Sequence, residues 1–131
     1  IPDIKELREK TTGAFGFSGN KGEVEVLVKN WDGIDTIPEL MKLAGVGFIL
    51  ETDGQKGASL YLQTESGVIS GEYKIPKEEV YYGDTTNAGD VFLAATISGL
   101  MDLRENTYEK DLEMVLEGAS QKTLMFLRSR T

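Results

Sequence analysis

The chain has 131 residues, 40% of them apolar and 27% charged, and a net charge of −8. Its length supports one domain with one hydrophobic core, no apolar run reaches the roughly 20 residues of a membrane span, and the acidic balance argues against a nucleic-acid partner. There is no histidine and no cysteine, which excludes Ser-His-Asp and Cys-His catalysis, disulfides and zinc sites built on His or Cys. We therefore expect a cytoplasmic protein whose acid–base chemistry falls to Asp, Glu, Lys or Tyr.

The first half of the chain alternates between short helical and strand patterns. The apolar spacing predicts a helix over residues 3–10, a strand over 14–17, a helix over 23–28 and a strand over 46–52. Before the last of these, Thr36 followed by Glu39 predicts a capping box that opens a helix ending near Ala44. The strand at 46–52 carries an unbroken apolar run up to Leu50, which is typical of a parallel sheet covered on both faces.

The second half combines a strand pair with two longer helices. The pattern predicts a glycine turn at 53–57, strands over 58–63 and 68–75 around a polar turn at 64–67, a helix from the 84–90 loop to about 101, and a last helix over 107–128. Interleaved helices and strands indicate an α/β fold. We expect one domain over residues 1–131, with a mostly parallel sheet flanked by helices in Rossmann-like layers and a small β-meander inserted before the 84–90 loop.

The strongest functional signal is the run Asp84-Thr85-Thr86-Asn87-Ala88-Gly89-Asp90. It ends at an aspartate and an apolar stretch follows at once, so backbone N–H groups and a carboxylate meet at the opening of a helix. Such an opening binds anions, because its N–H groups lack partners and the helix dipole favours negative charge. Taken alone, Asp90 is more often an N-cap than a base. Beside bound phosphate, however, its carboxylate would take the proton of an attacking hydroxyl.

Two further runs lie at the ends of predicted strands. Asn20 and Glu23 share one face of a helical turn and suit either Mg²⁺, which prefers oxygen ligands, or a capping box, which is the commoner arrangement. The run from Thr52 to Gly57 suits either a ligand beyond the carboxyl end of a strand or a simple hairpin turn. We expect one rim of the sheet to collect all three runs.

Together these runs resemble motifs of the ribokinase-like (PfkB) carbohydrate kinases, in their C-terminal, nucleotide-binding part. That family has N-x-x-E, T-x-G-x-x-G and D-T-x-G-A-G-D in this order, and here they read Asn20-Lys21-Gly22-Glu23, Thr52-Asp53-Gly54-Gln55-Lys56-Gly57 and Asp84-Thr85-Thr86-Asn87-Ala88-Gly89-Asp90. The resemblance extends over nearly the whole chain. Two positions depart from it: Asn87 replaces the usual first glycine of G-A-G-D, and Asp53 places a carboxylate beside the expected polyanion.

The resemblance implies a catalytic role for the end of the 84–90 loop. Asp90 would be the general base that deprotonates the substrate hydroxyl. Asn87, Ala88 and Gly89, with the Asp90 amide, would form an anion hole that faces the transferred γ-phosphoryl group. Positioning and electrostatic stabilisation supply most of the catalysis in phosphoryl transfer, so a helix opening suits this role.

The resemblance also implies metal and nucleotide contacts. Asn20 and Glu23 would organise Mg²⁺ and its waters, and Asp84 with Thr86 would hold a monovalent cation, as in some members of the family. The expected contacts to the nucleotide are Asn20, Thr52, Gly54, Gln55, Lys56, Gly57, Ala58, Ser59, Gly89 and Ser120.

The sequence thus predicts an ATP-dependent carbohydrate kinase that uses ATP and Mg²⁺, with a sugar-type small molecule as acceptor. We expect no nucleic-acid or membrane partner, and a homodimer is compatible with this class. The family's sugar contacts lie in an N-terminal part that is not found here, and the chain opens without methionine, so we expect a C-terminal fragment with little or no turnover alone. Two alternatives remain open: a non-catalytic nucleotide-binding or regulatory module, and a structural α/β domain whose motifs are caps and turns.

Overall fold

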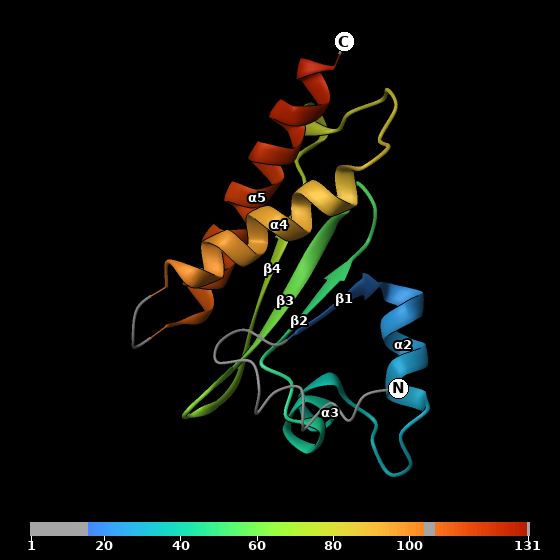
Figure 1. Ribbon diagram of the computed structural model, residues 1–131, viewed down its shortest axis with the longest axis vertical. Helices are drawn as coiled ribbons and strands as arrows, with labels where there is room; N and C mark the ends of the chain where they lie inside the picture. The colour runs from blue at the N-terminus through green and yellow to red at the C-terminus, as the bar shows by residue number, and fades with distance from the viewer. Residues whose placement is uncertain (1–15, 104–106, 131) are drawn as a thin grey trace.

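Figure 1 shows the computed structural model, which describes residues 16–103 and 107–130. The helix expected at 3–10 and the start of the strand expected at 14–17 lie outside these residues. The elements are β1 (Gly16–Asn20), α2 (Lys21–Lys29), α3 (Ile37–Ala44), β2 (Phe48–Thr52), β3 (Gly57–Thr64), β4 (Gly67–Lys74), the 3-10 turn η1 (Lys77–Glu79), α4 (Ala88–Met101) and α5 (Glu109–Ser129). Among the described helices, none combines the length and the apolar content that crossing a membrane requires.

The strands form a four-stranded sheet in the order β1-β2-β3-β4. β1 and β2 are parallel, whereas β2–β3 and β3–β4 are antiparallel. The expectation of a mostly parallel sheet is therefore wrong. β2 and β3 are antiparallel because only residues 53–56 connect them. Parallel neighbours need a crossover of about a dozen residues or more. The two strands expected as a small inserted meander make up half of the described sheet.

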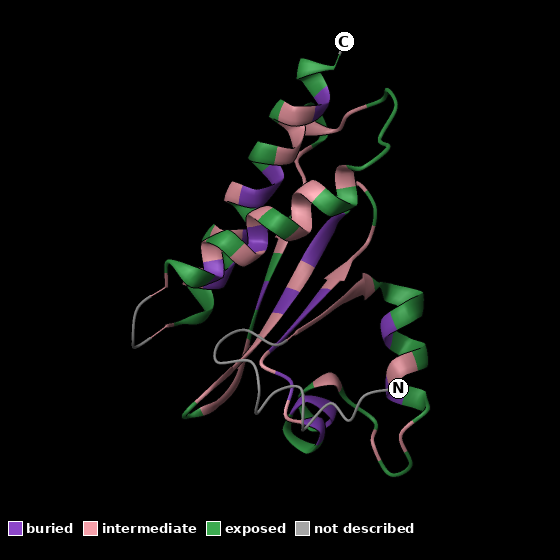
Figure 2. Ribbon diagram, in the orientation of Figure 1, coloured by how far each residue is buried: buried purple, intermediate pink, exposed green. Residues whose placement is uncertain are grey.

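Helices cover both faces of this sheet (Figure 1). α4 and α5 pack on one face, and α2 and α3 pack on the other. Residues of β2 alternate between the two layers, with Phe48 and Leu50 in the core under α4 and α5 and Ile49 in the core under α2 and α3. Ile49 and Leu50 are fully buried, which confirms the prediction of a strand covered on both faces and appears as purple along β2 in Figure 2.

α2 and α3 begin at the caps that the sequence predicts. The N–H of Glu23 donates to Asn20 Oδ1 at 2.8 Å, and the N–H of Asn20 donates to Glu23 Oε1 at 2.9 Å, which completes a capping box. The N–H of Glu39 donates to Thr36 Oγ1 at 3.3 Å, and the Thr36 hydroxyl donates back to the Glu39 carboxylate at 3.0 Å. Local capping chemistry therefore sets the start of both helices.

The strand register brings residues of the sequence motifs together at one rim of the sheet. Asn20 at the end of β1 pairs with Thr52 at the end of β2, and Thr52 pairs with Ala58 at the start of β3. Two of the three sequence motifs therefore begin side by side. The third motif is brought to this rim by α4, whose first turn lies near the β2–β3 turn.

Candidate functional site

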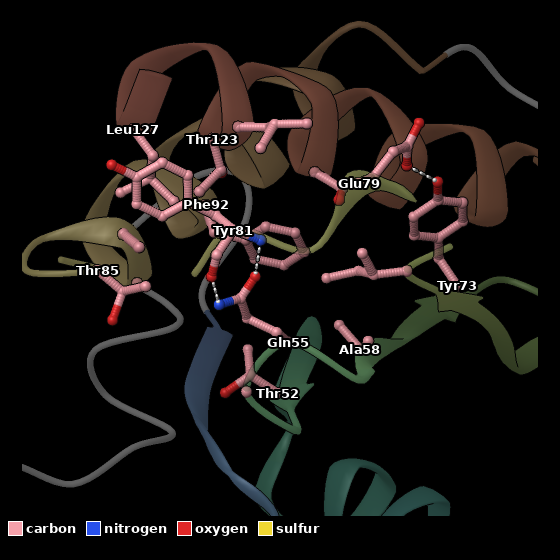
Figure 3. A pocket seen from close by; sticks show the side chains of 17 residues that line it. Thr52, Gln55, Ala58, Tyr73, Glu79, Tyr81, Thr85, Phe92, Thr123 and Leu127 are labelled. Atoms are coloured by element: carbon pink, nitrogen blue, oxygen red, sulfur yellow. Dashed lines mark hydrogen bonds between the residues drawn. The ribbon is translucent and has the colours of Figure 1, made fainter. Parts of the chain in front are cut away.

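A cavity of about 290 Å³ opens at this rim, between the β2–β3 turn and helices α4 and α5 (Figure 3). Its wall is mostly apolar. At one end it reaches the start of α4 near Thr85, and at the other end it reaches Tyr73 and Glu79. Most of the expected nucleotide contacts line it: Thr52, Gly54, Gln55, Gly57, Ala58, Gly89 and Ser120.

The other expected nucleotide contacts do not line this cavity. Lys56 and Ser59 instead border a second hollow of about 230 Å³, whose lining includes charged residues such as Lys21 and Glu51. Burial raises the pKa of the Glu51 carboxyl, and the nearby Lys21 ammonium works against this rise. Asn20 borders neither hollow. Its predicted contact with the nucleotide therefore stays a prediction.

The 84–90 loop enters α4 through an unusual residue. Asn87, not Asp90, is the N-cap of α4, and its φ of 69° lies in the left-handed region that glycine usually occupies. The N–H of Ala88 donates to the carbonyl of Thr85 at 3.0 Å and closes a turn across Asn87. Asparagine tolerates this conformation, so the replacement of the family's glycine leaves the helix opening in place.

Asp90 lies in the first turn of α4, so the N-cap alternative for this residue is wrong. Its side chain is exposed and has no hydrogen bond or ion pair with any other described residue. Since the N–H of Ala88 is already used, the open donors of this helix end come from Gly89 and Asp90. The first turn therefore offers free N–H groups and a free carboxylate.

The start of the loop is held by hydrogen bonds and an ion pair. The hydroxyl and the N–H of Thr86 donate to Asp84 Oδ1 at 2.6 Å and 2.9 Å. Arg130, at the end of α5, lies with Nη2 3.5 Å from Asp84 Oδ2, and its Nη1 donates to the carbonyl of Thr86. The hydrogen bonds from Thr86, followed by the Arg130 charge, lower the pKa of the Asp84 carboxyl.

The geometry around Asn20 supports the capping alternative for the N-x-x-E motif. One oxygen of each side chain is used in the capping box described above, and the second Glu23 oxygen has no partner among the described residues. These residues hold no group of three acidic side chains that would bind a metal. Magnesium binding by Asn20 and Glu23 therefore stays a prediction. Asp53, the other departure from the family pattern, pairs with Lys21 at 3.5 Å.

Gln55 ties the β2–β3 turn to the segment that follows β4. The N–H of Tyr81 donates to Gln55 Oε1 at 2.5 Å, and Gln55 Nε2 donates to the carbonyl of Tyr81 (Figure 3). The glutamine side chain thus pairs with one backbone residue much as a neighbouring strand would. Both residues line the cavity, so this pair fixes the distance between two of its walls.

We predict that Gln55→Glu destabilises the protein by about 1–3 kcal/mol, because a carboxylate cannot donate to the Tyr81 carbonyl and would lie against it. Urea denaturation measures this change. Gln63→Glu is the matched control, since the side chain of Gln63 donates only to the carbonyl of its neighbour Thr64, at 3.2 Å; we expect it to cost less than about 0.5 kcal/mol. Equal losses in the two variants would mean that the pair with Tyr81 contributes nothing specific.

Several residues of the cavity were not predicted from the sequence. They are Tyr73, Ile75, Glu79, Tyr81, Phe92, Thr123, Leu124 and Leu127. Leu124 and Leu127 lie in the last helix that the sequence predicts over 107–128, and the apolar spacing of that helix could have pointed to them. The Tyr73 hydroxyl donates to Glu79 at 3.0 Å, and burial, followed by this hydrogen bond, raises the pKa of Tyr73 to about 12. No local pattern marks that pair.

Comparison with known proteins supports the fold. No family model and no curated protein matches the sequence. Among solved structures, ribokinase from Thermotoga maritima is 23% identical, with a TM-score of 0.50 over 86% of this chain and 42% of that chain. Aminoimidazole riboside kinase from Salmonella enterica is 21% identical, with a TM-score of 0.52 over 84% of this chain and 35% of that chain. The chain therefore spans less than half the length of these two kinases and has part of the ribokinase-like fold, as its motifs predict.

Proposed function

We propose that this chain is the nucleotide-binding part of a kinase that transfers the γ-phosphoryl group of ATP to the hydroxyl of a sugar-type acceptor. The observation that carries the proposal is a largely apolar cavity that ends at an open helix N-terminus with an unpaired carboxylate beside it. The fold shared with ribokinase and aminoimidazole riboside kinase supports the same class of reaction.

The shape of the cavity suggests how a nucleotide would lie in it. Tyr81, Phe92 and Leu124 form apolar walls that suit a base, and the start of α4 suits the phosphates. Ser120 is only 8% exposed, lines the cavity and has no hydrogen-bond partner among the described residues. The hydroxyl of this lining residue is a free donor, and we assign it a hydrogen bond to the bound nucleotide.

Asp90 is the proposed general base. Gly89 lines the cavity and Asp90, next in the chain, does not, which suits a carboxylate that faces the acceptor rather than the nucleotide. As the acceptor oxygen bonds to the γ-phosphorus, its proton passes to the Asp90 carboxylate, the bond from the γ-phosphorus to the bridging oxygen breaks, and ADP leaves. The free N–H groups of Gly89 and Asp90 stabilise the charge on the transferred group.

Magnesium would enter with the nucleotide and neutralise charge on the phosphates. The unpartnered oxygen of Glu23 is the protein group proposed to face that ion or its waters, with Asn20 beside it. Mg²⁺ keeps several waters and uses few protein ligands, so a single free carboxylate oxygen is compatible with it.

We expect calorimetric titration to detect ATP binding with a Kd below about 1 mM, and tighter binding when Mg²⁺ is present. Phe92→Glu, which puts a charge into the apolar wall, should abolish binding. Met101→Glu on the same helix should not, because Met101 is 76% exposed and lies outside the cavity. Loss of binding in both variants would contradict this cavity as the site. In the intact protein, ATP binding without transfer to any hydroxyl acceptor would instead indicate a nucleotide-binding module.

A further inference from the structure

Arg130 contacts both residues, Asp84 and Thr86, to which the resemblance to the carbohydrate kinases assigns a monovalent cation. Its Nη1 donates to the Thr86 carbonyl, and its Nη2 lies 3.5 Å from Asp84 Oδ2. The remaining Asp84 oxygen accepts the two hydrogen bonds from Thr86. A cation at this place would need the same oxygen atoms and would meet a permanent positive charge beside them.

Arg130 is held in this position from its own helix. It is the C-cap residue of α5, and the central carbon of its guanidinium lies 5.2 Å from the centre of the Phe126 ring. The planar guanidinium presents two N–H groups in a fixed fork, and here the fork spans one carbonyl and one carboxylate of the loop. A single side chain therefore joins the end of α5 to the start of the 84–90 loop.

We infer that the guanidinium of Arg130 takes the place of the monovalent cation at this loop, so that the protein binds no K⁺ there. The residues present do not fit the ion, because its ligands already have a cationic partner. The loop that leads through Asn87 to the open end of α4 is then ordered by the chain itself. This inference stands on the loop geometry; only its consequence, a transfer rate independent of K⁺, rests on the proposed function.

The test compares thermal unfolding in KCl, NaCl, CsCl and choline chloride, at a constant ionic strength of about 0.1 M so that screening of the exposed ion pair stays equal. We expect the melting temperature of the unmodified protein to be the same in all four salts within about 1 °C. Arg130→Gln frees the Asp84 and Thr86 oxygens, and K⁺ should then raise its melting temperature by roughly 2–4 °C over choline. Lys122→Gln removes a charge elsewhere on α5 and should show no such response.

Two results would overturn the inference. One is a K⁺-specific stabilisation of the unmodified protein, which would mean that an ion binds although Arg130 is present. The other is an Arg130→Gln variant with the same melting temperature in all four salts, which would make Arg130 a structural tie and nothing more. If that variant does not fold, Arg130→Lys keeps the charge and should be as indifferent to K⁺ as the unmodified protein. Because melting needs no phosphoryl transfer, a failure of the proposed kinase activity leaves this test intact.

Discussion

Asp90→Asn is expected to lower kcat for phosphoryl transfer by about 10²–10⁴-fold, the usual contribution of a positioned general base. Asparagine has nearly the same size but does not accept the proton of the acceptor hydroxyl. ATP affinity should change by less than about twofold, since Asp90 does not line the cavity. The rate is measured in the full-length protein as ADP release in the presence of acceptor, and the affinity is measured by calorimetry.

Asp102→Asn is the matched control. Asp102 is an exposed aspartate at the other end of the same helix, and we expect its replacement to leave kcat within about twofold, as for a surface change remote from the chemistry. If Asp90→Asn keeps most of its kcat, Asp90 is not the base. If it loses ATP binding as strongly as transfer, the carboxylate acts on the nucleotide, and another group must take the proton.

Local chemistry in the sequence predicts where α2 and α3 begin. Asn20 and Thr36 each have an acidic residue three positions later, and both cap a helix because capping depends on neighbours in the chain. The apolar run of β2 correctly predicts burial on both faces. Burial, however, does not determine the direction of the neighbouring strand. The turn at 53–56 determines it, and its length is visible in the sequence.

The candidate site is predicted only in part, because it combines local and distant contacts. The motif residues at the rim are local to strand ends and follow from the register of β1, β2 and β3. The pair of Gln55 with Tyr81 spans 26 residues, and that of Arg130 with Thr86 spans 44. No periodicity or cap links such positions. The N-cap of α4 differs from the expectation for another reason. Asn87 adopts the left-handed conformation, so α4 begins before Asp90.

Gly57→Ala is expected to lower the free energy of unfolding by about 2–4 kcal/mol, a large share of the stability of a small domain. Gly57 has a φ of 149°, and a Cβ atom there would lie 2.1 Å from the carbonyl oxygen of Tyr73. That oxygen belongs to the backbone of β4, which pairs with β3 at this point, so it cannot move without opening the sheet. Urea denaturation measures the loss.

Gly54→Ala separates the two causes of this loss. Gly54 lies in the same turn and has a φ of 57°, but a Cβ atom there would meet nothing within 4 Å. Its replacement should therefore cost only the strain of holding an alanine in the left-handed conformation, about 1–2 kcal/mol. Equal losses at both positions would mean that the turn depends on backbone conformation alone. A larger loss at Gly57 would mean that the second glycine of T-x-G-x-x-G is required because β4 passes too close to admit a side chain. That requirement would hold whether or not the turn binds a ligand.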